Sequence, residues 1–172
     1  HHIVALELTM DEHIDADLWI TPHGTPNIDF SQEFPATRVQ RVRSVPGVQR
    51  ADNLIVTFMN VALPSGAREA TLVYALEDFA RWNIPWNLES GNLADLRRGP
   101  YVIIDKSATR RFGEFAVGDY REILGHRLKI IGLTREALSF TTTPLSFMDF
   151  ARAQGAPAVE GCQTDANDGR SF

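Results

Sequence analysis

The sequence contains a single cysteine among its 172 residues. Cys162 therefore excludes an internal disulfide and any metal site built from several cysteines. It lies in the polar tail "EGCQTDANDGRSF", where no neighbouring histidine would activate its thiol. We do not expect this cysteine to act as a nucleophile.

Positive charge and long apolar runs are also scarce. The net charge is −5 and the pI is near 5.5, which gives no basic field and argues against nucleic acid as a partner. No run of about 18 apolar residues is present, so these residues alone do not span a bilayer. His1 and His2 are typical of a purification-tag remnant, and we expect the chain to be a piece of a larger protein.

Residues with potentially catalytic or phosphate-binding groups are dispersed in the sequence, and none has the partner residues that such a site requires. Ser65 lies in a predicted hairpin turn outside any nucleophile-elbow pattern, and His23 and His126 each stand beside a glycine in a predicted turn. The segment "GTPNID" lacks the spacing of a phosphate loop, and Pro26 has no N–H to offer. We therefore predict no catalytic residue and no cofactor.

An acidic cluster near the start of the chain could hold a cation. Its members are Asp11, Glu12, His13, Asp15 and Asp17. Solvated carboxylates at the start of a helix explain the cluster better, because nothing spaces three ligands as an oxygen cage requires. We predict no metal site.

With 44% apolar and 23% charged residues, the chain has the composition of a globular domain, and its periodicity predicts an α+β fold. Alternation and turn residues predict the following elements: a lead-in strand or frayed helix over 3–14, strands over 17–21, 48–63, 67–76 and 101–105, helices over 37–45 and 106–113, a hairpin over 117–134, and a strand followed by a helix over 138–155. The turn at 64–66 makes 48–76 a hairpin.

The same patterns predict which side chains are buried. We expect Val56, Ile103 and Ile130 in the core, and Ile123, Leu128 and Leu133 to face inward along the 117–134 hairpin, which Gly118, Gly125 and Gly132 punctuate. Val39, Val42 and Val45 lie three residues apart, so the helix over 37–45 is predicted to bury this face and to expose Arg38 and Arg41.

Residues 77–100 interrupt the strand order as a loop with a helical turn over 93–98. Trp82 and Trp86 are four residues apart, although Pro85 breaks a continuous helix between them. The tryptophans either pack under the loop or form a contact surface, because aromatic side chains dominate the energetics of interfaces. Trp82, Trp86 and Phe79 are therefore the candidate partner-contact residues.

Residues 101–134 resemble the extracytoplasmic core domain of ABC transporter permeases of the MacB/FtsX type. The matching residues are Val102–Asp105, Gly113, Val117, Gly118, Asp119, Gly125 and Ile130–Gly132, in that order. The segments 15–30 and 38–48 look like the amino-terminal half of this domain, closest to the DevC-like permeases of exporter systems. The resemblance covers most of residues 15–153.

The resemblance implies a MacB-like periplasmic core domain with βαβ-type units, a hairpin and a small inserted lobe. Residues 1–14 would be tag remnant and membrane-proximal lead-in, 15–155 the core domain with the insert at about 77–100, and 156–172 a polar tail leading back to the membrane. The residues near Leu18–Thr21 and Phe172 would then emerge at the same pole of the domain.

The resemblance also implies a function without catalysis. The domain would couple movement of membrane helices, driven by an ABC ATPase subunit, to a periplasmic adaptor (membrane fusion) protein and to substrate export from the inner membrane. The full permease would be a homodimer. Two other classes stay open: a soluble small-ligand-binding module, which needs an apolar pocket with convergent polar groups, and a hydrolase, which needs an acid/base pair within hydrogen-bond reach.

Overall fold

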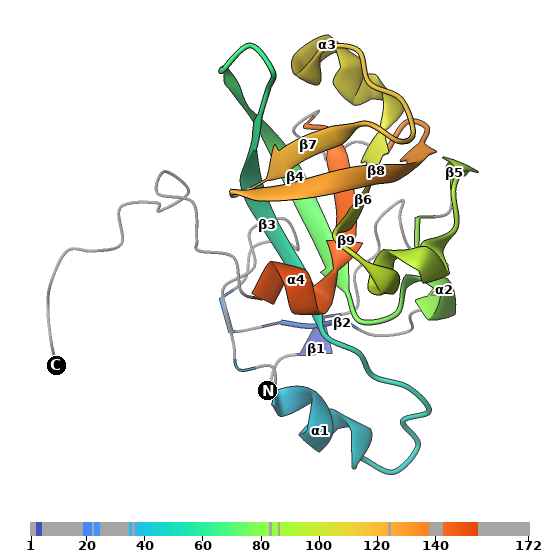
Figure 1. Ribbon diagram of the computed structural model, residues 1–172. Helices are drawn as coiled ribbons and strands as arrows, with labels where there is room; N and C mark the ends of the chain where they lie inside the picture. The colour runs from blue at the N-terminus through green and yellow to red at the C-terminus, as the bar shows by residue number, and fades with distance from the viewer. Residues whose placement is uncertain are drawn as a thin grey trace, which may run out of the picture.

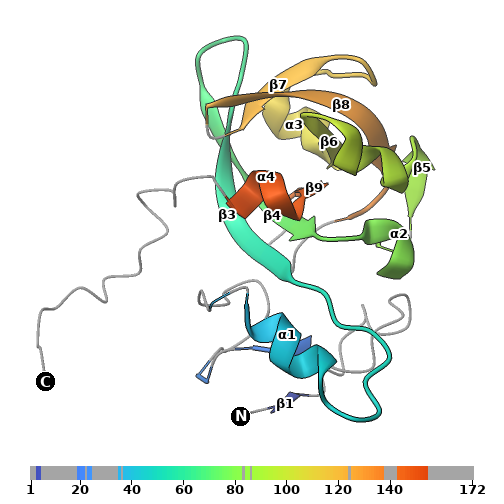
Figure 2. The same cartoon turned by 60° about the horizontal axis from the view of Figure 1, so that its bottom comes forward.

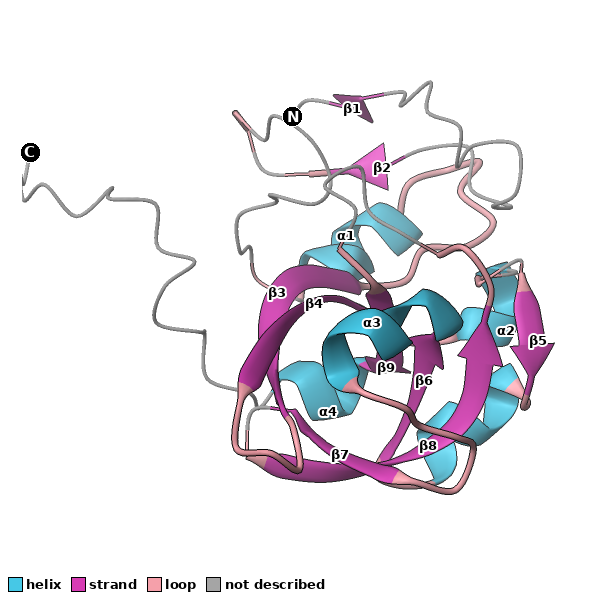
Figure 3. Cartoon of the chain, turned by 90° about the horizontal axis from the view of Figure 1, so that it is seen from above, coloured by secondary structure: helices cyan, strands magenta, loops and turns pink. Residues whose placement is uncertain are grey.

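A seven-stranded sheet dominates the computed structural model, which describes residues 3–4, 19–21, 23–24, 35, 37–82, 84–85, 87–123, 125–137 and 143–154. The strands, in spatial order, are β5 (Leu88–Ser90), β8 (His126–Thr134), β6 (Tyr101–Asp105), β9 (Leu145–Asp149), β4 (Arg68–Leu76), β3 (Leu54–Ala62) and β7 (Tyr120–Ile123). β7 also pairs with β8, so the sheet closes into a small barrel with β5 attached outside the ring (Figure 3).

The predicted hairpin forms the longest ladder of the barrel. β3 and β4 pair antiparallel from Leu54↔Leu76 to Ala62↔Arg68, joined by the predicted turn at residues 64–66. Two pairs, β4–β9 and β6–β8, are parallel, and parallel strands require a crossover connection. The strands and helices together confirm the predicted α+β class.

The inside of the barrel holds one apolar cluster, because side chains alternate between the two faces of each strand. The cluster draws its buried side chains from all six strands of the ring: Met59, Val61, Val73, Ala75, Val102, Ile104, Ile123, Leu128, Ile130 and Met148. Two helices add side chains to this cluster. Helix α3 (Thr109–Phe112) contributes Phe112, and Ala108 directly precedes it. Helix α4 (Phe150–Gln154) contributes Ala153. Ile130 is buried as predicted, and Leu133 is half-buried against the same cluster.

A second apolar cluster covers the outer face of β3, β4, β6 and β9. It contains the strand residues Val56, Leu72, Tyr74, Leu76, Ile103, Leu145 and Phe147. The predicted burial of Val56 and Ile103 is confirmed. Phe79, Ile84 and Leu96 from the 77–100 insert cover these strand residues and are themselves buried.

The insert is not the loop that its composition predicts. It forms helix α2 (Phe79–Trp82), strand β5 and the 3₁₀ helix η2 (Leu93–Arg98). The reason is β5, which pairs with β8 and extends the sheet. The insert is therefore ordered by pairing with a strand distant in the sequence, which its local sequence pattern does not predict. η2 is the predicted helical turn.

The segment that carries the family resemblance folds as predicted. β6 ends at Asp105, a fully buried carboxylate that accepts hydrogen bonds from the Ser107 N–H (2.9 Å), the Thr134 hydroxyl (2.8 Å) and the Ala137 N–H (2.7 Å). The 3₁₀ helix η3 (Lys106–Ala108) and α3 follow. Asp105 is therefore a structural residue, which ties the turn after β8 to the end of β6.

Two of the three glycines in the 117–134 hairpin stand at turns, and one does not. Gly118 has a φ of +101° in the turn before β7, a backbone conformation that residues with a Cβ rarely adopt. Gly132 instead lies within β8. A Cβ at Gly132 would come 2.5 Å from the Ser90 carbonyl oxygen, and its small size lets β5 approach β8.

The amino-terminal side lies at the end of the barrel opposite α3 (Figures 1 and 2). Strands β1 (Ile3–Val4) and β2 (Trp19–Ile20) pair there, and helix α1 (Arg38–Arg43) precedes β3. Arg38 and Arg41 are exposed as predicted. Val39 is buried, but Val45 is 52% exposed because the helix ends before it.

The carboxyl-terminal elements, β9 followed by α4, confirm the predicted order of a strand and then a helix within 138–155. Four parts of the chain lie outside the described residues: residues 138–142, Leu18, the tail over 156–172 and the acidic cluster. The prediction that Leu18–Thr21 and Phe172 share a pole therefore stays a prediction. Among the helices that are described, none is long and apolar enough to cross a membrane.

Candidate partner-contact site

Trp82, the last residue of α2, is half-buried rather than free at the surface. Its indole N–H donates a hydrogen bond to the Asp52 carboxylate at 2.8 Å. The Arg50 guanidinium lies over the ring, 4.9 Å from the ring centroid. The edge and one face of the indole are thus occupied by the segment that connects α1 to β3.

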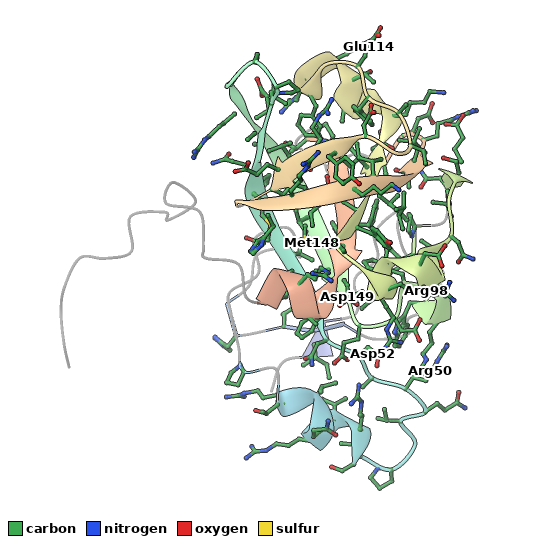
Figure 4. All side chains as sticks on the ribbon, in the orientation of Figure 1. Arg50, Asp52, Arg98, Glu114, Met148 and Asp149 are labelled. Atoms are coloured by element: carbon green, nitrogen blue, oxygen red, sulfur yellow. The ribbon has the colours of Figure 1, made fainter. Side chains whose placement is uncertain are left out.

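Asp52 is the centre of this arrangement. Its side chain is only 4% exposed, and a buried carboxylate is stable only when it is paired and hydrogen-bonded. Besides the indole N–H, it accepts a hydrogen bond from the Arg43 guanidinium at 2.9 Å, and Arg81 lies 3.8 Å away. Figure 4 shows Arg50 and Asp52 between α1 and the end of the barrel that carries α2.

Glu77 provides a second carboxylate at the end of β4. It accepts a hydrogen bond from the backbone N–H of Asn53 at 2.8 Å and another from the Arg43 guanidinium at 3.1 Å. Arg43 therefore bridges Asp52 and Glu77, and its Nε also donates to the Ala51 carbonyl at 2.7 Å. We call Arg43, Arg50, Asp52, Glu77 and Trp82 the α1 junction.

The α1 junction joins three parts of the chain that are distant in sequence. Arg43 is the last residue of α1, and Asp52 lies shortly before β3. Glu77 directly follows β4, and Trp82 is the last residue of α2. Both carboxylates of the junction are paired with Arg43, and Arg50 stacks on Trp82 and donates to the Arg81 carbonyl, so the junction is built as a structural contact. The arrangement ties α1 to the end of the barrel that carries α2.

The other two predicted contact residues are placed differently. Phe79 is 3% exposed and packs edge-to-face on Phe147, with ring centroids 6.0 Å apart, so its side chain supports the core instead of facing a partner. Trp86 lies outside the described residues. Sequence spacing could not reveal the α1 junction, because Arg43, Asp52 and Glu77 meet only through the tertiary fold.

In the parts of the chain that the structure describes, the reactive side chains named from the sequence are not assembled into a site. His23, Ser65 and His126 are exposed and come from separate turns or strand ends, while Cys162 lies outside the described residues. Within the described ranges, no three His, Cys, Asp or Glu side chains are placed to hold a metal ion.

An open hollow of about 480 Å³ lies beside β5, lined by Asn87, Leu88, Glu89, Arg135 and Glu136. Hydrogen bonds from Arg135 and Lys106 hold the pKa of Glu89 below its usual 4.5, so this carboxylate stays ionised. Leu88 is the single apolar residue of the lining, whereas ligand pockets are predominantly apolar. The hollow is therefore a poor ligand pocket.

The closed barrel, with an insert packed on its outer face, is the fold of the MacB-like periplasmic core domain. One solved structure with this fold is the periplasmic region of MacB from Actinobacillus actinomycetemcomitans, with a TM-score of 0.52 and 12% identity over 70% of this chain and 56% of that chain. Another is the extracellular domain of the noncanonic ABC-type transporter YknZ from Gram-positive bacteria, with a TM-score of 0.55 and 16% identity over 70% of this chain and 65% of that chain.

These similarities confirm the fold that the sequence resemblance implied. The chain spans less than two thirds of the length of either domain. No family model matches the sequence, and no curated protein matches it. The DevC-like assignment stays a prediction.

Proposed function

We propose that this chain is a non-catalytic extracytoplasmic domain of an ABC exporter permease. It would transmit movement of the membrane helices, driven by an ATPase subunit, to a periplasmic adaptor. The observation that carries the proposal is the shared fold, since MacB and YknZ are ABC-type transporters and the matched regions are periplasmic or extracellular. Inner-membrane attachment, homodimerisation and the boundaries at residues 14, 77–100 and 155 belong to the same proposal.

The geometry of the described residues supports a mechanical role. The barrel is filled by one apolar cluster, and dense packing of this kind transmits strain instead of absorbing it. The α1 junction ties the segment that enters the barrel to the insert on its outer face. Displacement of α1 would therefore move the barrel as a body.

Partner contact through Trp82 and Trp86 stays a prediction. For Trp82, the hydrogen bond to Asp52 and the stacked Arg50 favour the alternative weighed from the sequence, in which the ring packs internally. A truncation of Trp82 is then expected to act through stability.

The full permease, reconstituted with its ATPase subunit and adaptor, tests the proposal. We expect the adaptor to raise the rate of ATP hydrolysis, and deletion of residues 37–154 to remove this response while basal hydrolysis remains. An adaptor response that survives the deletion would contradict the proposal. So would ester, peptide or ATP hydrolysis by the isolated domain that disappears on His126→Ala or Cys162→Ala.

A further inference from the structure

The outer face of β7 and of the first half of β8 is uncovered, unlike the outer face of the other strands of the ring. Insert residues cover β3, β4, β6 and β9, and in β8 only Ile131, in the second half of the strand, packs against that outer cluster. Figure 1 shows both strands crossing the front of the barrel with no helix of the described residues over them. We call Val117, Tyr120, Glu122, Arg127 and Lys129 the β7–β8 face.

Two large apolar side chains are exposed on this face. Val117 is 50% exposed and Tyr120 is 45% exposed, on either side of the Gly118–Asp119 turn. The turn is fixed by hydrogen bonds from the Gly118 N–H to the Ile130 carbonyl and from the Ile130 N–H to the Asp119 carbonyl, both at 2.8 Å. The two side chains are therefore presented on a rigid backbone.

Arg121 reinforces that backbone from the inner side. Its side chain points inward and is 8% exposed, and it donates hydrogen bonds to the carbonyls of Tyr120 (2.8 Å) and Glu114 (3.0 Å). Figure 4 places Glu114 at the α3 end of the barrel. A surface held in place before binding loses less conformational entropy when a partner docks.

Cations frame the apolar pair, and within the described part of the chain neither Arg127 nor Lys129 has a carboxylate within 4 Å. Tyr120 faces Lys129 across the ladder and Glu122 faces Arg127, so all four side chains share one face. The Arg127 guanidinium nevertheless lies over the Tyr120 ring, 4.3 Å from its centroid, and forms no ion pair with Glu122. By contrast, Arg43, Arg81, Arg97, Arg98 and Arg135 each have a carboxylate within 4 Å.

We propose that the β7–β8 face is the docking surface for the adaptor, and that it binds an adaptor segment with carboxylates beside an apolar side chain. The carboxylates would pair with Arg127 and Lys129, and the apolar side chain would pack on Val117 and Tyr120. Tyrosine and arginine are enriched among the residues that dominate interface energy. The inference rests on the proposed function, because it names the partner through that function.

A protein fits this face better than an anionic lipid surface does. Glu122 stands within the face beside Arg127, so the face carries charges of both signs, which a protein segment can match residue by residue and a uniformly anionic headgroup layer cannot. The β7–β8 face also lies towards the α3 end of the barrel, away from β2 and α1, through which the chain enters (Figure 1). In the proposed permease this end points away from the membrane.

The test measures adaptor binding to the full permease carrying Tyr120→Ala or the double substitution Arg127→Glu and Lys129→Glu. Each variant is expected to raise the Kd at least about tenfold, as loss of an interface anchor or of steering charge does. The double substitution should also reverse the salt dependence of association, because the two new carboxylates repel the carboxylates of the adaptor segment and salt screens that repulsion. The control is Arg38→Glu with Arg41→Glu, the same charge change on the exposed face of α1, which should change the Kd less than about twofold.

The outcomes separate the two proposals. If the unaltered permease binds no adaptor, the proposed function fails. If it binds and both variants bind equally well with unchanged melting temperatures, only the β7–β8 face is overturned. Binding of anionic lipid vesicles that depends on Arg127 and Lys129, without an effect on the adaptor, would overturn it in favour of a lipid surface.

Discussion

At the scale of single residues, Trp82 shows how a side chain that is typical of an interface is used internally. The indole bridges two segments by donating to the buried Asp52 carboxylate and by stacking under Arg50. Truncation would remove the ring and leave Asp52 with one hydrogen-bond donor fewer. Such a carboxylate is costly because desolvation is no longer compensated.

We therefore expect Trp82→Ala to lower the free energy of unfolding by about 2–4 kcal/mol. Trp82→Phe keeps a ring under Arg50 but removes the N–H donor and part of the aromatic surface, so a smaller loss of about 1–2 kcal/mol is expected. Urea denaturation of the isolated domain measures both values, with Arg97→Gln as an exposed control on η2. A Trp82→Ala variant of unchanged stability that binds the adaptor weakly would instead restore the contact role.

At the scale of elements, the α1 junction determines how firmly the amino-terminal segment is attached to the barrel. Arg43 reaches one carboxylate before β3 and one at the end of β4, so α1 is held by charges that belong to the hairpin. Glu77 is partly exposed, and ion pairs of this kind contribute modestly, about 0–1 kcal/mol each. Local opening of α1 should therefore precede unfolding of the barrel.

Glu77→Gln is expected to raise the rate of amide hydrogen exchange in residues 38–50 by about threefold or more, because it weakens one of two attachments of Arg43. Exchange in β4, β6 and β9 should stay unchanged, since their amides lie in the packed barrel. Glu89→Gln removes a carboxylate that pairs with Lys106 and Arg135 far from α1 and serves as the matched control. Equal exchange in the Glu77→Gln and unaltered proteins would show that the junction does not hold α1.

The elements also show what the sequence could predict. The β3–β4 hairpin and the β7–β8 hairpin follow from alternation and from turn residues between adjacent segments, so local pattern was sufficient. Closure of the barrel is not predictable from local pattern, because it pairs Val61 with Ile123, and no local signal encodes a pairing between residues so distant in the sequence. β5 was missed for the same reason, and it gave the insert an order that its composition does not show.

The candidate site was predicted less well than the fold. Phe79 and Trp82 were chosen because aromatic residues in an insert are typical of contact surfaces, but one is buried and the other is bonded to Asp52. Tyr120 and Val117 were overlooked because they occur within the segment that resembles the permease domain, where turn and strand roles explained them. Their exposure depends on which strands the insert covers, and only the tertiary structure shows that.

At the scale of the whole molecule, the central claim is that the chain is an extracytoplasmic permease domain. The claim depends on a fold shared with MacB and YknZ at 12% and 16% identity. A location outside the cytoplasm is the consequence most directly open to measurement. It can be read from a single exposed position in the full protein.

The decisive measurement labels Ser65→Cys, in the exposed β3–β4 turn, with a membrane-impermeant maleimide in intact cells with a permeabilised outer membrane. The substitution is made in a Cys162→Ser background, so that the domain offers one thiol. The account predicts full labelling before the inner membrane is broken. Labelling that appears only after lysis would place the domain in the cytoplasm and contradict the account.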